Sequence, residues 1–262
     1  MYNFIQYFPN LSTINYGVNK IFVKSIENYL IQNKDKKIKV LDFGCSRKPY
    51  KYLFDEFDNV VEYVGIDVYD GEFVDIVYDG GEVPFPNQYF DIIFSSSVLE
   101  HVEDLDSSLE ELHRVLKIGG YSIHSVPFFH HTHGTPFDFN RLTYFGWMSK
   151  FKNKYSDISI NNTDGRLCCI MNMITSQINF IAIDFIKLFL SKFTRSTKRD
   201  ITNGDASPEN SKTKKLAIMY FFLKLNPINF ILGLICWMSN IFPTRQYREG
   251  EITSAFVIEL NK

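Results

Sequence analysis

Apolar and polar positions alternate along this chain with the two periods of regular secondary structure. Short apolar runs of strand length recur, bounded by Gly, Pro, Asp or Ser. Elsewhere apolar residues recur every three or four positions, as in amphipathic helices. Strands alternating with helices predict an α/β fold with a doubly wound, mostly parallel sheet covered on both faces. The pattern predicts strands at 38–43, 62–67, 73–77, 91–95, 121–126, 156–161 and 254–262, and helices ending near 31 and spanning 50–57, 105–116 and 143–152.

The pattern changes near residue 166. Residues 167–193 and 216–242 are nearly all apolar, and the linker between them, 194–215, is rich in Ser, Thr, Gly and Lys. A long apolar stretch before the final strand is expected to form a helical insertion. The expected organisation is one domain from 1–165 and 246–262, with a hydrophobic helical insertion at 166–245.

Neither apolar block has the pattern of a membrane span. A span needs about 20 predominantly apolar residues, whereas Asp184 and Lys187 interrupt the first block and Pro227 interrupts the second. Three interpretations stay open: helices buried over the sheet, a homodimer interface, or amphipathic helices in peripheral contact with the inner face of a membrane. Basic residues around the linker would suit anionic lipid headgroups.

Composition narrows the class of protein. The chain has 262 residues, 45% hydrophobic and 16% aromatic, which is enough for a buried core and argues against disorder. The net charge of −2 gives no case for a nucleic-acid partner. The 4 cysteines include no C-x-x-C pair, and the N-terminus lacks the features of a secretory signal. Free thiols without a signal predict a cytoplasmic protein.

A glycine turn follows the first strand. The sequence K-V-L-D-F-G-C-S-R-K-P-Y at 39–50 is a strand, a tight turn and a helix start, whose free N–H groups point at whatever lies above the strand. Asp67 ends the second strand, where an acid can accept both hydroxyls of a ribose. Asp79 could accept from an adenine amino group. The alternatives are that Asp42 caps the next helix and that Asp67 is a plain turn residue.

Four motifs stand in order along the first half of the chain. They are V-L-D-F-G-C-S, D-G-G-E-V-P-F-P-N-Q-Y-F-D, V-L-E-H-V and R-V-L-K-I-G-G, at 40–46, 79–91, 98–102 and 114–120. In this order and spacing they resemble those of the class I S-adenosylmethionine-dependent methyltransferases, in the type 11-like group. The resemblance implies a Rossmann-like methyltransferase fold with seven strands, the last antiparallel, and S-adenosylmethionine as the cofactor.

The resemblance also assigns roles to residues. It places Asp42, Gly44 and Ser46 along the methionine end of the cofactor, Asp67 at the ribose and Asp79 at the adenine. Small side chains after the fourth strand, including Ser96, would let a ligand lie close to the backbone. The expected cofactor-binding residues are Asp42, Gly44, Cys45, Ser46, Asp67, Val68, Asp79, Gly80 and Ser96.

Two positions depart from the family pattern. Ser46 replaces the second Gly of the first motif, and we expect it to fit the turn only with a negative φ, narrowing the space above the backbone. Ile118 replaces a Pro that often precedes the Gly-Gly pair, which affects loop stiffness alone.

Histidines follow the fourth and fifth strands, where loops of this fold carry specificity. The candidate catalytic residues are His101, which could instead be structural, and His130, His131 and His133. No metal is expected, because no Cys or carboxylate completes a recognisable zinc spacing. Asp138 and Arg141 either pair with each other or contact the acceptor.

We expect methylation of a small-molecule, sugar or lipid-linked acceptor, at an oxygen. An NAD-dependent dehydrogenase is an alternative enzyme class, but it needs G-x-G-x-x-G where this chain has G-C-S-R-K-P. A further alternative is a non-catalytic domain that binds the cofactor or associates with a membrane.

Overall fold

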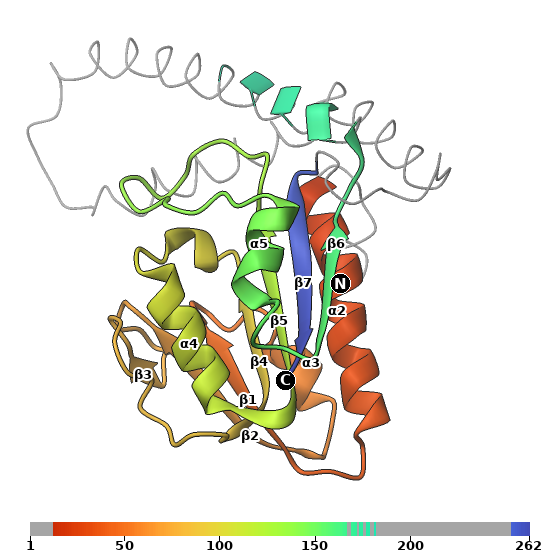
Figure 1. Cartoon of the computed structure of the whole chain (residues 1–262), viewed down its shortest axis with the longest axis vertical. Helices are drawn as coiled ribbons and strands as arrows, with labels where there is room; N and C mark the ends of the chain where they lie inside the picture. Colours follow the sequence, from red (N-terminus) through yellow and green to blue (C-terminus); the bar gives the residue numbers. More distant parts are fainter. Residues whose placement is uncertain (1–12, 167–168, 172, 175–176, 179–180, 182–252) are drawn as a thin grey trace, which may run out of the picture. The chain divides into compact units, whose positions relative to one another are not determined.

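The computed structural model describes residues 13–166, 169–171, 173–174, 177–178, 181 and 253–262 (Figure 1). They contain one seven-stranded sheet with helices packed against it. Its elements are α2 (Thr13–Gln32), β1 (Ile38–Phe43), α3 (Lys51–Asp55), β2 (Val60–Asp67), β3 (Ile76–Val77), β4 (Phe90–Ser96), the 3₁₀ turn η1 (Leu99–His101), α4 (Leu105–Val115), β5 (Leu116–Pro127), α5 (Tyr144–Phe151), β6 (Asp157–Asn162) and β7 (Ala255–Asn261).

The strand order is β3-β2-β1-β4-β5-β7-β6. The pairs β1–β2, β1–β4, β2–β3 and β4–β5 are parallel, whereas β7 runs antiparallel to both β5 and β6. The predicted doubly wound sheet with an antiparallel last strand is therefore confirmed. Strands β2 and β3 lie on one side of β1, and β4 and β5 lie on its other side. In such sheets ligands bind at the carboxyl ends of the strands where the strand order switches, here between β1 and β4.

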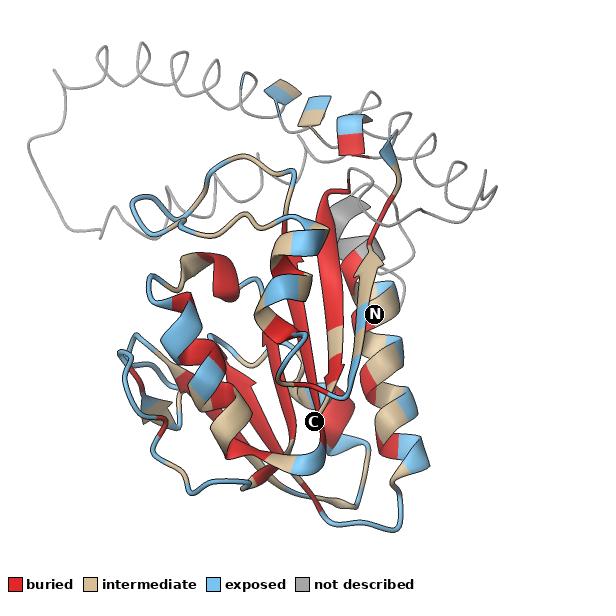
Figure 2. Cartoon of the chain, in the orientation of Figure 1, coloured by how far each residue is buried: buried red, intermediate tan, exposed pale blue. Residues whose placement is uncertain are grey.

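The central strands are buried on both faces, which explains their continuous apolar sequence (Figure 2). Neighbouring side chains of β4 point to opposite faces: Ile93 packs in the cluster formed with α4 and α5. Phe94 contacts Phe22 of α2 and stacks on Phe54 of α3, with ring centroids 6.0 and 5.3 Å apart. The sheet is thus covered by helices on both faces.

Helix α4 shows how the sequence specifies one of these layers. Leu105, Leu109, Leu112 and Val115 are buried on one stripe, as their spacing predicts. Asp104 caps the helix by accepting a hydrogen bond from the backbone N–H of Ser107 at 3.1 Å. The helix ends at Val115, one residue before the predicted end at 116, and the chain passes directly into β5.

Several predicted boundaries differ from the structure. The helix expected at 50–57 covers only Lys51–Asp55. The third strand is limited to Ile76–Val77, because the Asp75 side chain accepts from the Gly65 N–H at 2.6 Å in place of a backbone partner. Strand β5 begins at Leu116, and its register against β4 shifts between Leu116 and Tyr121, which accommodates the Gly-Gly pair.

The chain divides into two units, 17–166 with 245–262, which holds the sheet, and 1–16 with 167–244. The expected linker and second apolar block, 194–215 and 216–242, lie outside the described residues, as does most of the first block. Among the residues that are described, no helix has the length and apolar character needed to cross a membrane.

Candidate functional site

The turn after β1 is tied to the end of β2. Gly44 has φ +77°, and the backbone N–H groups of Gly44 and Cys45 both donate to the carbonyl of Ile66, at 2.8 and 3.0 Å. A Cβ on Gly44 would lie 2.4 Å from the Val98 side chain, so only glycine fits here. The turn therefore packs between the end of β2 and the loop after β4.

The backbone conformation of Ser46 differs from the one expected from the sequence. Its φ is +46°, in the left-handed region, so the expected negative φ is wrong. This conformation costs a non-glycine residue roughly 1–2 kcal/mol. The backbone N–H of Ser46 donates to Asp67 Oδ2 at 2.8 Å, and this charge-assisted bond offsets the strain.

Asp67 lies at the carboxyl end of β2, half-exposed, as its predicted ribose contact requires. Besides Ser46, it accepts from the backbone N–H of Tyr69 at 3.3 Å through Oδ1. A carboxylate has about four lone-pair positions, so acceptor capacity remains for ligand hydroxyls. Val68, the next predicted residue, is exposed beside it.

Asp42 lies in the interior, where it is only 3% exposed. It does not cap α3, whose N-cap is Tyr50. The Tyr63 hydroxyl donates to Asp42 Oδ2 at 2.5 Å. Burial nevertheless raises the pKa of the Asp42 carboxyl to about 7, with the Tyr63 bond opposing the rise. Asp42 is therefore a buried residue of the strand that leads into the turn, and its side chain is bonded to Tyr63.

Lys48 was missed in the sequence, which gives no signal for its role. Its Nζ donates to Asp75 Oδ2 at 2.5 Å. Its side chain lies over Gly65, where a Cβ would come within 2.5 Å of Lys48 Cε. The turn region therefore gathers the carboxyl groups of Asp42, Asp67 and Asp75, of which Asp75 is paired with Lys48 and the buried Asp42 is bonded to Tyr63.

The loop after β3 carries Asp79 and Gly80, which the sequence predicts at the adenine. Asp79 is exposed, and Gly80 and Gly81 have φ values of +113° and +79°. No atom lies within 4 Å of a Cβ built on either glycine, so the backbone there is open to a ligand. The Tyr78 hydroxyl fixes the loop by donating to the Gly81 carbonyl at 2.7 Å.

Ser96 is the last residue of β4 and makes hydroxyl contacts with two other elements. Its hydroxyl accepts from Ser125 Oγ at 3.0 Å and lies 3.3 Å from the Tyr50 hydroxyl. Tyr50 in turn donates to Asn19 of α2 at 3.1 Å. These contacts link β4, β5 and α2 beside the predicted cofactor residues.

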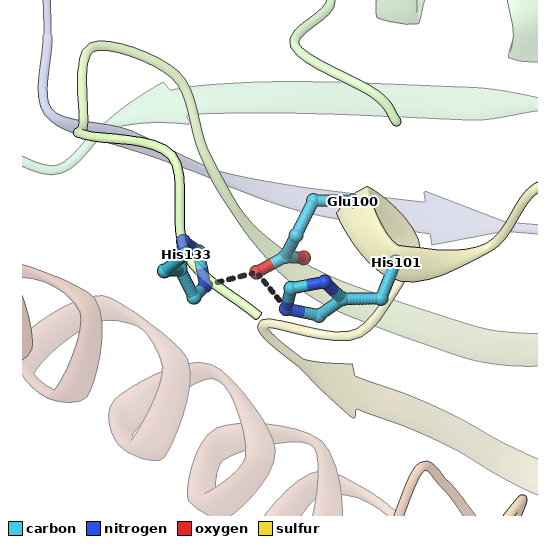
Figure 3. A group of neighbouring side chains, drawn as sticks. All are labelled: Glu100, His101 and His133. Carbon is cyan, nitrogen blue, oxygen red and sulfur yellow. Dashed lines mark ion pairs between the residues drawn. The ribbon is translucent and has the colours of Figure 1, made fainter. Parts of the chain in front are cut away.

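A second group of side chains lies on the loops after β4 and β5 (Figure 3). Glu100 Oε1 is 3.7 Å from His101 Nε2 and 3.7 Å from His133 Nε2. Glu100 is fully buried, and neither carboxylate oxygen has a hydrogen-bond partner among the described residues. Burial raises its pKa to about 7. Sequence reasoning missed Glu100, although it stands beside His101 in V-L-E-H-V.

The imidazoles of His101 and His133 are oriented by polar contacts to their Nδ1 atoms. His101 Nδ1 is hydrogen-bonded to the Phe137 carbonyl. His133 Nδ1 lies 3.1 Å from Arg141 Nη2 and 3.6 Å from Asp138 Oδ2. Arg141 and Asp138 pair with each other at 2.5 Å, which agrees with one of the two alternatives for these residues.

The remaining predicted histidines lie beside this group. The ring centroids of His130 and His133 are 5.3 Å apart, and those of His130 and His131 are 4.0 Å apart. His130 Nδ1 is 3.0 Å from the His131 carbonyl. Burial lowers the pKa of His130 to about 4, so its imidazole is neutral at pH 7. The structure thus brings all four candidate histidines together.

Comparison with known proteins gives a family match over part of the chain. A family model described as a methyltransferase domain matches residues 41–124. That segment begins in β1 and ends in β5, and includes the glycine turn, Asp67, Asp79 and the Glu100–His101 pair.

Curated relatives match over a short stretch. The ubiquinone/menaquinone biosynthesis C-methyltransferase UbiE of Xanthomonas oryzae pv. oryzae is 50% identical over 38 residues, 14% of this chain and 15% of that protein. UbiE of Vibrio vulnificus is 54% identical over 39 residues, 15% of each. The chain therefore matches about 15% of the length of these relatives. A solved S-adenosylmethionine-dependent methyltransferase from Archaeoglobus fulgidus aligns over 94% of this chain and 97% of its own, at 15% identity and a TM-score of 0.45.

Proposed function

We propose that this chain, whose residues 41–124 form a class I S-adenosylmethionine-dependent methyltransferase domain, transfers a methyl group to a hydroxyl oxygen. The observation that carries the proposal is the acid-lined glycine turn at the switch point between β1 and β4, inside the matched segment. An NAD-dependent dehydrogenase is disfavoured, because the family match is to methyltransferases and the turn lacks the glycine spacing of a pyrophosphate site.

The residues around the turn fit the cofactor by their chemistry. When bound, S-adenosylmethionine supplies an electrophilic methyl group on a sulfonium centre. Asp67, half-exposed at the end of β2, suits its positive charge and has lone pairs left for ribose hydroxyls. The open backbone at Gly80 and Gly81 leaves room for a base. The residues that would hold the cofactor are those predicted from the sequence: Asp42, Gly44, Cys45, Ser46, Asp67, Val68, Asp79, Gly80 and Ser96.

The histidines support oxygen as the acceptor atom. A hydroxyl must lose its proton as its oxygen is methylated, and a base within reach contributes about 10²–10⁴-fold. An imidazole of the group formed by His101, His130, His131 and His133 can accept that proton. Holding the acceptor in line supplies roughly 7–11 kcal/mol more. The proton leaves the acceptor for the imidazole, and the oxygen keeps its electron pair for the new bond.

A carbon acceptor is the second candidate. The observation in its favour is that the relatives matched over 38 and 39 residues carry the name C-methyltransferase. A carbon nucleophile also needs deprotonation, so the same histidines could serve it. Identifying the methylated atom in the product separates the two candidates.

The proposal extends to the size and solubility of the acceptor. The apolar blocks around the basic linker support a lipid-linked acceptor and peripheral contact with a membrane. A homodimer formed through 166–245 would instead leave a small molecule or sugar as the acceptor.

Methyl transfer from labelled S-adenosylmethionine tests the proposal. Phenols, sugars and lipid-headgroup alcohols would be offered in parallel, and the product analysed by mass spectrometry. An O-methylated product supports the proposal. Binding of the cofactor without transfer to any acceptor class would favour the non-catalytic alternative.

A further inference from the structure

Glu100, His101 and His133 form a site with the composition of a metal centre. We propose that these three side chains bind one divalent first-row transition-metal ion, through a carboxylate oxygen and two imidazole nitrogens. The sequence predicted no metal because no known ligand spacing occurs along the chain. Such spacing could not indicate this site, because its ligands come from two different loops (Figure 3).

The distances between ligand atoms are close to those of a bound site. Glu100 Oε1 lies 3.7 Å from each imidazole Nε2, and the three ligand atoms all lie within 4.8 Å of one another. Tetrahedral coordination at about 2.1 Å would place ligand atoms about 3.4 Å apart. Binding therefore requires the three ligand atoms to move closer together by side-chain rotation.

Glu100 provides an independent reason to infer a cation. Its side chain is fully buried, yet neither oxygen has a hydrogen-bond partner in the described part of the chain. Buried carboxyl groups are normally hydrogen-bonded, paired with charge or coordinated to metal. The two imidazoles lie 3.7 Å from its Oε1, and Arg141 and Asp138 act on it electrostatically from further away. A cation between the three groups would satisfy the carboxylate and both nitrogens at once.

The outer contacts resemble those of metal-binding histidines. The Phe137 carbonyl accepts from His101 Nδ1–H, which leaves the Nε2 lone pair facing Glu100. Asp138, 3.6 Å from His133 Nδ1, can do the same for the second imidazole. In the present arrangement Arg141 donates to that Nδ1, so metal binding would move the His133 proton from Nε2 to Nδ1.

Gly134 allows the two loops to meet. It has φ +64°, and a Cβ at this position would lie 2.9 Å from His101 Cε1. Any other residue would push the loop carrying His133 away from η1. The close approach that brings the ligands together therefore depends on this glycine.

The ligand set indicates the kind of ion and, if the proposed methyl transfer holds, its use. Two imidazoles and one carboxylate suit Zn²⁺, Fe²⁺, Co²⁺ or Mn²⁺ better than Ca²⁺. Three protein ligands leave positions open for an oxygen of the acceptor, and an ion lowers the pKa of an oxygen it binds. The acceptor class would then be a hydroxyl compound, its proton passing to His130 or water as the methyl group moves from sulfur to oxygen.

Titration of the full-length protein with Zn²⁺ and Co²⁺, after removal of metal with a chelator, tests the inference. We expect one ion per chain by calorimetry and a Co²⁺ visible spectrum typical of nitrogen and oxygen ligands. E100Q and H133A should each weaken Zn²⁺ binding by more than the roughly 10–100-fold that an outer contact is worth. H113Q, which changes a histidine of α4 bonded to the Lys154 carbonyl, should bind like the wild type.

Thermal unfolding of each variant shows whether it is folded, and the wild-type Co²⁺ spectrum is informative even if a variant is not. No binding by folded wild type, or wild-type affinity in folded E100Q and H133A, would overturn the metal site. Calorimetry with S-adenosylmethionine, run in parallel, separates the two claims. Cofactor binding without metal binding refutes this inference alone, and metal binding without cofactor binding refutes only the proposed function.

Discussion

The backbone N–H of Ser46 donates a hydrogen bond to the Asp67 carboxylate at 2.8 Å. This contact joins the turn after β1 to the end of β2, where the cofactor residues are expected. It also explains why a serine with φ +46° can occupy the position at which the family pattern has glycine. The acid that is predicted to bind a ribose therefore also holds the backbone around it.

Replacing Ser46 by glycine should stabilise the fold. Glycine removes the left-handed strain of roughly 1–2 kcal/mol but loses more entropy on folding, so we expect a net gain of up to about 1 kcal/mol. Urea unfolding measures the change. Ser149→Gly, inside helix α5, is the matched control and should lose roughly 0.5 kcal/mol. Equal losses in both variants would show that Ser46 is not strained.

Periodicity was sufficient to predict the sheet and the buried face of α4, because both depend on which side chains face the core. The first family motif located Gly44 because the turn is continuous in sequence, and Asp67 was located by its place at the end of the second predicted strand. The φ of Ser46 could not be predicted, since it depends on a bond to a residue of another strand. Likewise, Glu100 meets His133 only because two loops fold together across the ends of β4 and β5.

Asp42 should make stability depend on pH. Burial raises its pKa to about 7 in the folded protein, above the value near 4 of an exposed aspartate. Between these values the folded state holds a proton that the unfolded state has lost, so the contribution of Asp42 to stability falls as pH rises from about 4 to 7. Asp42→Asn should therefore gain stability relative to the wild type as pH rises through this window.

Urea unfolding at several pH values between 4.5 and 7.5, with chelator present, measures that difference. Glu100 has a similarly raised pKa, but it is present in both proteins and cancels from the comparison. Parallel stability curves for wild type and Asp42→Asn would contradict the assignment.

His130 should act in turnover and not in cofactor binding. Its Ala variant is expected to lose about 10²-fold or more in methyl transfer, because the neutral imidazole is no longer available to accept the hydroxyl proton. Calorimetry with the cofactor should give an unchanged affinity. His101, His131 and His133 would be replaced in turn. If all four variants keep near-normal rates, transfer depends on alignment of the acceptor alone.

Vesicle flotation tests the expected role of the apolar blocks. The full-length protein should float with anionic vesicles, since Lys and Arg near such a surface contribute roughly 1 kcal/mol each. A variant lacking 167–244 should stay in the soluble fraction, and neutral vesicles are the control. A dimer on a sizing column together with no flotation would instead assign these blocks to a subunit interface.

Calorimetry with S-adenosylmethionine and NAD, on the wild type and Asp67→Ala, tests the central claim most directly. Asp70→Ala, an exposed acid in the same loop, is the matched control. The wild type and the control should bind S-adenosylmethionine and give no response to NAD. Asp67→Ala should bind about 1.5–3 kcal/mol more weakly, or roughly 10- to 150-fold, because hydrogen bonds to a charged group are lost. Tight binding of NAD without a response to S-adenosylmethionine would contradict the account.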